Sequence, residues 1–228
     1  MSQAPVTRMV EDYLTLIWKA YEWPGGEPTT TDMAAQLGVT ASSVSANLKK
    51  LARDGFIEYE PYGRITLTEI GSQLAIGIVR RHRIIETYLV KQLGLSWDQV
   101  HDEADQLEHA VSEVVLARMD EVLGWPTEDP HGDPIPRLEG DTPEPDTVPL
   151  LDAQRNVALE VARVSDRSPD VLRYLHARGV TVGARLEVLE VALAVGTVSV
   201  AIGSEETGAG QTDITSASAA AIRVRIAR

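Results

Sequence analysis

The sequence predicts an α+β protein with an N-terminal winged helix-turn-helix, two longer helices in the middle and a small C-terminal β-barrel. Three observations support this order. A helix-turn-helix pattern and two β-like segments fall within residues 28–68, helical periodicity runs from residue 69 to 123, and glycine-separated β-like segments follow residue 157. At 228 residues the chain is long enough for a substantial core and for two small domains.

The first predicted helix covers residues 5–22, and the Pro-Gly-Gly sequence at residues 24–26 ends it. Met9 on this helix and Met33 on the next are expected to pack in the core rather than bind metal. The apolar side chains recur at helical spacing, and they are Val6, Met9, Val10, Tyr13, Leu14, Ile17 and Trp18.

Residues 32–51 predict a helix-turn-helix, with Gly38 in the turn between a helix over residues 32–37 and a second over residues 41–54. A run of threonines before the first helix supplies its N-cap. The second helix presents short polar and basic side chains, which suit base edges and phosphates in a DNA major groove. The candidate DNA-binding residues here are Thr40, Ser42, Ser43, Ser45, Asn47, Lys49 and Lys50.

Two β-like segments, residues 57–60 and 64–68, flank the Pro-Tyr-Gly turn at residues 61–63 and predict a hairpin. Placed after a helix-turn-helix, this hairpin corresponds to a wing, and Arg64 near its tip is a candidate contact to phosphate or minor groove. The alternative is a small helical bundle with a polar surface.

Two longer helices are predicted next, over residues 69–93 and from residue 96 or 98 to 123. His82 and Glu86 are four residues apart on the first, so both face the same side. On the second, the spacing i, i+4, i+7, i+8 places four metal-type side chains on one helical face: His101, Asp105, Glu108 and His109. Imidazoles and carboxylates on one strip favour a divalent metal site, although a solvated polar face is the alternative. His131 and His176 stand alone and are expected at the surface.

Residues 126–149 are rich in Pro, Asp and Gly and predict a loop and linker. Four β-like segments and one short helix follow, which predict a small barrel of SH3-like type, with a sandwich as the alternative. The predicted strands cover residues 158–164, 185–194, 197–202 and 221–227, and the helix covers residues 169–178.

The net charge of −13 first argues against a nucleic-acid partner, but the acidity is local. Residues 97–146 hold 15 Asp and Glu against two Arg, and the rest of the chain has 19 acidic and 19 basic residues. The absence of cysteine excludes disulfides and thiolate ligands, so any metal must be held by oxygen and nitrogen. No apolar run approaches the length of a membrane span and no secretion signal is seen, so we expect no membrane partner and a cytoplasmic location.

The order of these elements resembles the diphtheria toxin repressor family of metal-activated transcription repressors, in its manganese-dependent (MntR-like) branch. The similarity is strongest at residues 10–14, 81–86 and 100–109, and the acidic Gly-Asp-Pro-Ile-Pro segment at residues 132–136 has a counterpart in relatives. The resemblance implies a winged helix-turn-helix domain over residues 1–73, a helical dimerisation and metal-binding domain over 74–140, a Pro-rich linker over 141–152 and an SH3-like, FeoA-type domain over 153–228.

The resemblance also implies two metal sites. The first, called here the Asp12 site, consists of Asp12, Asp105, Glu108 and His109. The second, the His82 site, consists of His82, Glu86, His101 and a ligand from the barrel, for which Asp166 and Asp170 are the candidates. Manganese-responsive members with two closely spaced metals carry a glutamate where this chain has Thr15. This departure and the presence of His101 indicate that the layout follows the iron-type members.

Metal identity follows from ligand chemistry. Iron-type members have methionine and cysteine where this chain has Asp12 and Asp105, and two carboxylates favour hard Mn²⁺ over softer, later metals. Fe²⁺, Co²⁺ or Zn²⁺ could also bind in vitro. The expected function is a Mn²⁺-dependent repressor that binds palindromic operator DNA as a homodimer and controls manganese homeostasis.

Three alternatives remain open. The first is an iron-responsive repressor of the same family, and the second is a metallohydrolase with a DNA-binding domain. The third is a metal-independent winged-helix regulator whose acidic helices serve only dimerisation. An enzyme is disfavoured because the sequence has no Gly-rich phosphate loop, nucleophile elbow or His-Glu-x-x-His motif.

Overall fold

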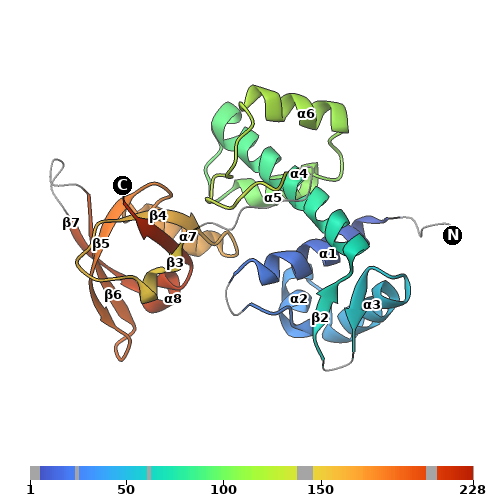
Figure 1. Ribbon diagram of the computed structural model, residues 1–228, viewed down its shortest axis with the longest axis horizontal. Helices are drawn as coiled ribbons and strands as arrows, with labels where there is room; N and C mark the ends of the chain where they lie inside the picture. Colours follow the sequence, from blue (N-terminus) through green and yellow to red (C-terminus); the bar gives the residue numbers. More distant parts are fainter. Residues whose placement is uncertain (1–5, 24–25, 61–62, 138–145, 204–209, 228) are drawn as a thin grey trace. The chain divides into compact units, whose positions relative to one another are not determined.

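The computed structural model describes residues 6–23, 26–60, 63–137, 146–203 and 210–227 (Figure 1). The chain divides into two compact units, one of residues 1–82 with 136–141 and one of residues 83–135 with 142–228. Parts of three predictions lie outside the described residues: the Pro-Gly at 24–25, the hairpin turn at 61–62 and the first half of the linker.

The first unit has the predicted helix-turn-helix and wing. Thr29 and Thr40 cap the second and third helices by accepting hydrogen bonds from Asp32 N and Ser43 N, and Gly38 takes a φ of 63° in the turn. Met33 is buried, as predicted. The elements are α1 (Arg8–Tyr21), α2 (Thr30–Leu37), α3 (Ala41–Arg53), the antiparallel pair β1 (Ile57–Tyr59) and β2 (Ile65–Leu67), and the start of α4 (Glu69–Leu93).

Helix α4 is a single helix of 25 residues with the predicted bounds. The prediction of one helix up to residue 123 is wrong, because the chain forms α5 (Val100–Leu107) and α6 (Glu113–Val122). Ser112 breaks the run: its backbone is extended, at φ −74° and ψ 156°, and its hydroxyl accepts from Val115 N at the start of α6. Glu108 and His109 consequently lie in the turn after α5 and not on its face.

Residues 126–135 form a loop, as predicted, but this loop is packed inside the second unit. His131, Asp133 and Ile135 are all buried, so the prediction that His131 lies at the surface is wrong. Gly132 has a φ of 81°, and a Cβ at this position would collide with the carbonyl oxygen of Ala162. The loop therefore approaches the β domain too closely for any residue other than glycine. His176 is exposed, as predicted.

The β domain is an antiparallel sheet of six strands within the described residues, in the order β3-β8-β4-β5-β6-β7. Alternating apolar side chains of these strands form one core with Leu172 and Leu175 of α7 (Pro169–His176). The α+β class with a small β domain is confirmed; the short β3, polar β7 and helix α8 (Ser216–Ala219) were not predicted. The strands are β3 (Val148–Pro149), β4 (Leu159–Val164), β5 (Arg185–Ala192), β6 (Thr197–Ile202), β7 (Gly210–Thr215) and β8 (Ile222–Ile226).

In the part of the chain that the structure describes, no helix is long and apolar enough to cross a membrane.

Candidate metal centre and nucleic-acid interface

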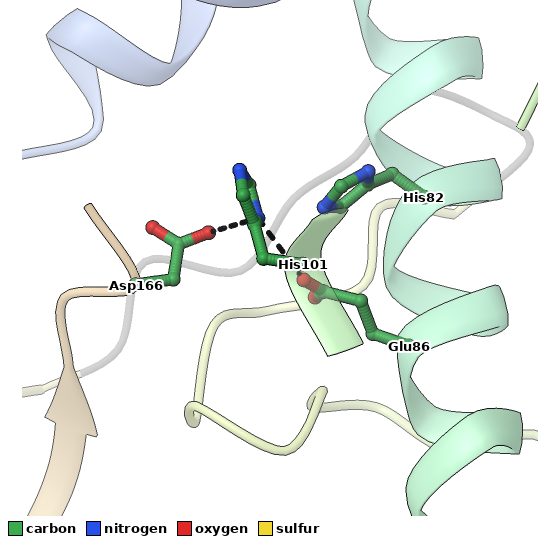
Figure 2. Close-up of side chains that lie close together, drawn as sticks. All are labelled: His82, Glu86, His101 and Asp166. Atoms are coloured by element: carbon green, nitrogen blue, oxygen red, sulfur yellow. Dashed lines mark hydrogen bonds and ion pairs between the residues drawn. The ribbon is translucent and has the colours of Figure 1, made fainter. Parts of the chain in front are cut away.

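Glu86 of α4, His101 of α5 and Asp166, which follows β4, meet within the second unit (Figure 2). His101 Nδ1 lies 3.2 Å from Glu86 Oε1 and 3.2 Å from Asp166 Oδ2. His82 lies one turn before Glu86 on the same helix, and one nitrogen or oxygen of each of the four side chains lies within 4.8 Å of the others. The structure thus groups the residues predicted for the His82 site.

The chemistry of this donor set fits a divalent cation. Two imidazoles and two carboxylates converge, and Glu86 and His82 are buried while the side chains of Asp166 and His101 are 14% and 29% exposed. Carboxylates that are removed from water need a compensating cation or hydrogen bonds. A partly open group of two nitrogen and two oxygen donors suits Mn²⁺, Fe²⁺ or Zn²⁺.

Asp166 and not Asp170 lies at this group. The side chain of Asp170 is 90% exposed, and its Oδ1 lies 2.6 Å from Arg173 Nη2 on the same helix. Arg173 also pairs with Asp98 at 3.2 Å. Asp170 is thus part of a surface ion-pair cluster in α7.

His131 contacts the second carboxylate oxygen of Glu86. Its Nδ1 is 3.7 Å from Glu86 Oε2 and its Nε2 is 2.7 Å from the carbonyl oxygen of Trp97. Burial disfavours the imidazolium, but its interaction with the nearby Glu86 carboxylate and the charges of Asp129 and Asp166 outweigh the effect of burial and raise the pKa of His131 to about 10. The sequence prediction missed this residue; the only available signal was its position beside the Gly-Asp-Pro-Ile-Pro segment that resembles relatives.

A buried arginine–aspartate network extends from His131 to the β domain. Arg83 of α4 lies 3.5 Å from both Asp129 Oδ2 and Asp133 Oδ2, and Arg163 Nε of β4 donates to Asp133 Oδ1 at 2.6 Å. A β-bulge between Val161 and Arg163 interrupts the register with β8 at this point. Burial, then the charges of Asp133 and Glu86, raise the pKa of Asp129 to about 7, against the opposing charges of His131 and Arg83. The network links α4, the loop and β4.

Three of the four residues predicted for the Asp12 site lie in the second unit. Glu108 Oε1 is 3.4 Å from His109 Nε2, and both side chains are mostly buried. The Asp105 carboxylate is half exposed and lies 3.8 Å from His101 Nε2. Asp12 is on α1 in the first unit, so its meeting with the other three residues stays a prediction.

Most of the predicted DNA-binding side chains are exposed on the first unit. Ser45 and Asn47 are half-buried, and Asn47 Nδ2 donates to the hydroxyl of Tyr13 at 3.0 Å. Arg64 on the wing is exposed and lies 3.0 Å from Glu27. The exposed members are Thr40, Ser42, Ser43, Lys49, Lys50 and Arg64.

Three family models match consecutive parts of the chain. Residues 6–65 match the N-terminal DNA binding domain of the iron dependent repressor, and residues 68–137 match its metal binding and dimerisation domain. Residues 148–226 match the FeoA domain. Together with the clustered donors and the helix-turn-helix, these matches define a metal-dependent transcriptional repressor.

Curated relatives and solved structures indicate the same class of protein. The iron-dependent repressor IdeR of Mycobacterium tuberculosis is 36% identical over 190 residues, which cover 78% of this chain and 82% of that protein. A structure described as a manganese-dependent transcriptional repressor complex with manganese is 43% identical, with a TM-score of 0.89 over 96% of this chain and 100% of the other. The crystal structure of T. acidophilum IdeR has a TM-score of 0.81 at 27% identity, over 98% of this chain and 100% of the other. This chain belongs to the diphtheria toxin repressor family, a class of transcriptional repressors and not of enzymes.

Proposed function

We propose that Mn²⁺ is the co-repressor of this protein, and that the metal-loaded dimer binds a palindromic operator and controls manganese homeostasis in the cytoplasm. The observation that carries the proposal is the donor set of the His82 site, which contains only nitrogen and oxygen in a chain without cysteine. The likeness to a manganese-dependent repressor at 43% identity supports the same metal.

We assign metal binding to two sets of residues. His82, Glu86, His101 and Asp166 hold one ion, which supplies the positive charge that their two carboxylates need. Asp12, Asp105, Glu108 and His109 hold the other, and two of these ligands are aspartates where iron-type members carry sulfur. In this proposal the DNA-binding domain ends at residue 73, the dimerisation and metal-binding domain at residue 140 and the linker at residue 152.

The residues of the Asp12 site connect the two functions. Asp12 is on α1, whose apolar face packs in the same core as Leu48 of α3, so a constraint on Asp12 also constrains the recognition helix. A dimer that reads a palindrome must hold its two recognition helices about 34–36 Å apart, or a multiple of that distance. In this arrangement Lys49 and Lys50 neutralise phosphates. Ser42 and Ser43 are in the first turn of α3, the end of a recognition helix that contacts base edges, and their hydroxyls make those contacts.

The test is DNA binding with and without Mn²⁺, on a palindromic duplex selected from a random library with the metal present. The wild type should bind tightly only with Mn²⁺, and Asp105→Ala and Glu86→Ala should each need more metal. Asp152→Ala removes an exposed carboxylate that belongs to neither set; it is the matched control and should behave as wild type. Equal binding with and without metal would contradict the proposal and favour the metal-independent regulator.

An iron-responsive repressor is the second candidate, because curated relatives at 36% identity are iron-dependent. The same DNA-binding assay under anaerobic conditions, with Fe²⁺ in place of Mn²⁺, separates the two. Activation at lower free Fe²⁺ than free Mn²⁺ would favour the iron reading. Co²⁺ and Zn²⁺ are expected to bind these ligands in vitro as well, since Mn²⁺ lies at the weak end of the affinity order.

A further inference from the structure

We propose that His131 is a positioning residue that holds the carboxylate of Glu86 in its metal-binding orientation from behind the His82 site. The inference rests on the proposed metal site but concerns a residue outside its ligand set. His131 belongs to a buried loop of the second unit, and its side chain contacts Oε2 of Glu86, whereas His101 contacts Oε1.

The orientation of the His131 ring follows from the hydrogen bond between its Nε2 and the carbonyl oxygen of Trp97. A carbonyl oxygen can only accept, so the 2.7 Å contact with Trp97 O requires a hydrogen on His131 Nε2. The ring also stacks on the Trp97 indole, with centroids 5.8 Å apart and planes 22° apart. These two contacts fix the ring, and its Nδ1 edge is thereby directed at Glu86 Oε2, 3.7 Å away.

The main chain of His131 is fixed as well. Its N–H donates to Asp129 Oδ1 at 2.8 Å, and its carbonyl oxygen accepts from Val164 N at 2.9 Å. Val164 is the last residue of β4 and precedes Asp166 by two positions. One residue therefore contacts Glu86 through its side chain and the strand that leads to Asp166 through its backbone.

The two oxygens of Glu86 consequently have separate roles. Oε1 lies 3.2 Å from His101 Nδ1, on the side where the ligand atoms of the His82 site gather, and Oε2 faces His131. Without the second contact the buried carboxylate has more rotational freedom, and metal binding must restrict it. Loss of such an outer partner costs about 10–100-fold in metal affinity.

Two variants separate the contacts of His131. In His131→Gln the side-chain amide can still donate to Trp97 O but places no polar atom at the Nδ1 position beside Glu86, whereas His131→Asn has the reverse pattern. We would measure Mn²⁺ affinity by calorimetry on the full chain carrying Asp105→Ala, so that the His82 site dominates. We expect His131→Gln to bind Mn²⁺ about 10–100-fold more weakly and His131→Asn to keep most of the affinity.

The opposite order, with His131→Asn weakened and His131→Gln as wild type, would overturn the inference and leave only a structural role in holding Trp97. Equal affinity of both variants with the parent would overturn it too. Glu86→Ala distinguishes a failure of the His131 proposal from a failure of the metal site. This variant should abolish Mn²⁺ binding at the His82 site, and unchanged Mn²⁺ affinity would overturn the proposed site itself.

Wild-type protein gives an independent readout should the variants fail to fold. Diamagnetic Zn²⁺ bound at the His82 site should shift the ring ¹⁵N resonances of His131, because its Nδ1 faces a ligand carboxylate. The ring resonances of exposed His176 serve as the control and should move less. No shift at His131 upon Zn²⁺ binding would contradict the positioning role.

Discussion

Replacement of Asp133 by alanine tests how the second unit is held together. This buried carboxylate accepts a hydrogen bond from Arg163 Nε at 2.6 Å and lies 3.5 Å from Arg83 Nη2. Both arginines are also buried, so Asp133→Ala leaves two buried guanidinium groups with less compensating charge. Removing one partner of a buried ion pair costs about 3–5 kcal/mol, and we expect a loss of that size in the free energy of unfolding of the second unit. Asp133→Asn keeps an acceptor oxygen and should lose less.

The assay is urea unfolding followed by tryptophan fluorescence, with Trp18 and Trp23 replaced by phenylalanine so that the signal reports the second unit. The matched control is Asp170→Ala, which removes a carboxylate 2.6 Å from Arg173 on the exposed surface of the same unit. Such an exposed pair contributes little, because water and salt screen it. A destabilisation by Asp133→Ala no larger than that by Asp170→Ala would refute the role of the buried network.

Three further predictions concern DNA binding, pH and the α5–α6 break. Lys49→Ala and Lys50→Ala should each weaken binding to all duplexes and lower the slope of log K against log salt by about 0.9 per lost phosphate contact; an unchanged slope in a salt titration would exclude the contact. In metal-free protein the pKa of His131 is raised from 6.5 to about 10, so the folded state holds a proton that the unfolded chain releases. Its stabilisation is complete below about pH 6.5 and is lost as the pH rises towards 10, and urea unfolding at several pH values should show this loss in the wild type but not in His131→Gln. Ser112→Ala removes the N-cap of α6 and should cost about 0.5–2 kcal/mol in unfolding free energy; no change by the same assay would show that the cap does not stabilise the helix.

The strongest sequence signals predicted the first unit and α4 well. Apolar periodicity defines α1 and α3, and the N-caps Thr29 and Thr40 with Gly38 between them mark the turn. These signals are local, since each depends on residues within one or two turns of the chain. Local signals are what a single sequence carries best.

Two errors in the predicted elements have physical reasons: the apolar periodicity continues across the break between α5 and α6, and strand β7 has no apolar periodicity. The apolar spacing of α5 continues into α6, so the N-cap at Ser112 was overlooked. Strand β7 has the sequence GQTDIT with only Ile214 buried, and its pairing with β6 is therefore not visible as an apolar pattern. The first error joined two helices into one and the second omitted a strand, and neither changes the fold class.

The candidate site was only partly predictable because its remaining members are set by tertiary contacts. His82, Glu86 and His101 have helical spacings that suggest ligands, whereas Asp166 and Asp170 cannot be distinguished by sequence alone. His131 lies in a Pro- and Gly-rich segment that suggests an exposed loop. Its burial comes from residues that are distant along the chain, namely Glu86 and Trp97.

The central claim is that metal binding and DNA binding are coupled, and linkage offers its most direct test. If Mn²⁺ strengthens operator binding by some factor, the operator must strengthen Mn²⁺ binding by the same factor. We would measure Mn²⁺ affinity of the full chain by calorimetry with and without a saturating palindromic duplex. The account predicts an affinity about 5–150-fold higher with the operator, equal to the factor found for DNA. The same Mn²⁺ affinity in both conditions would contradict it.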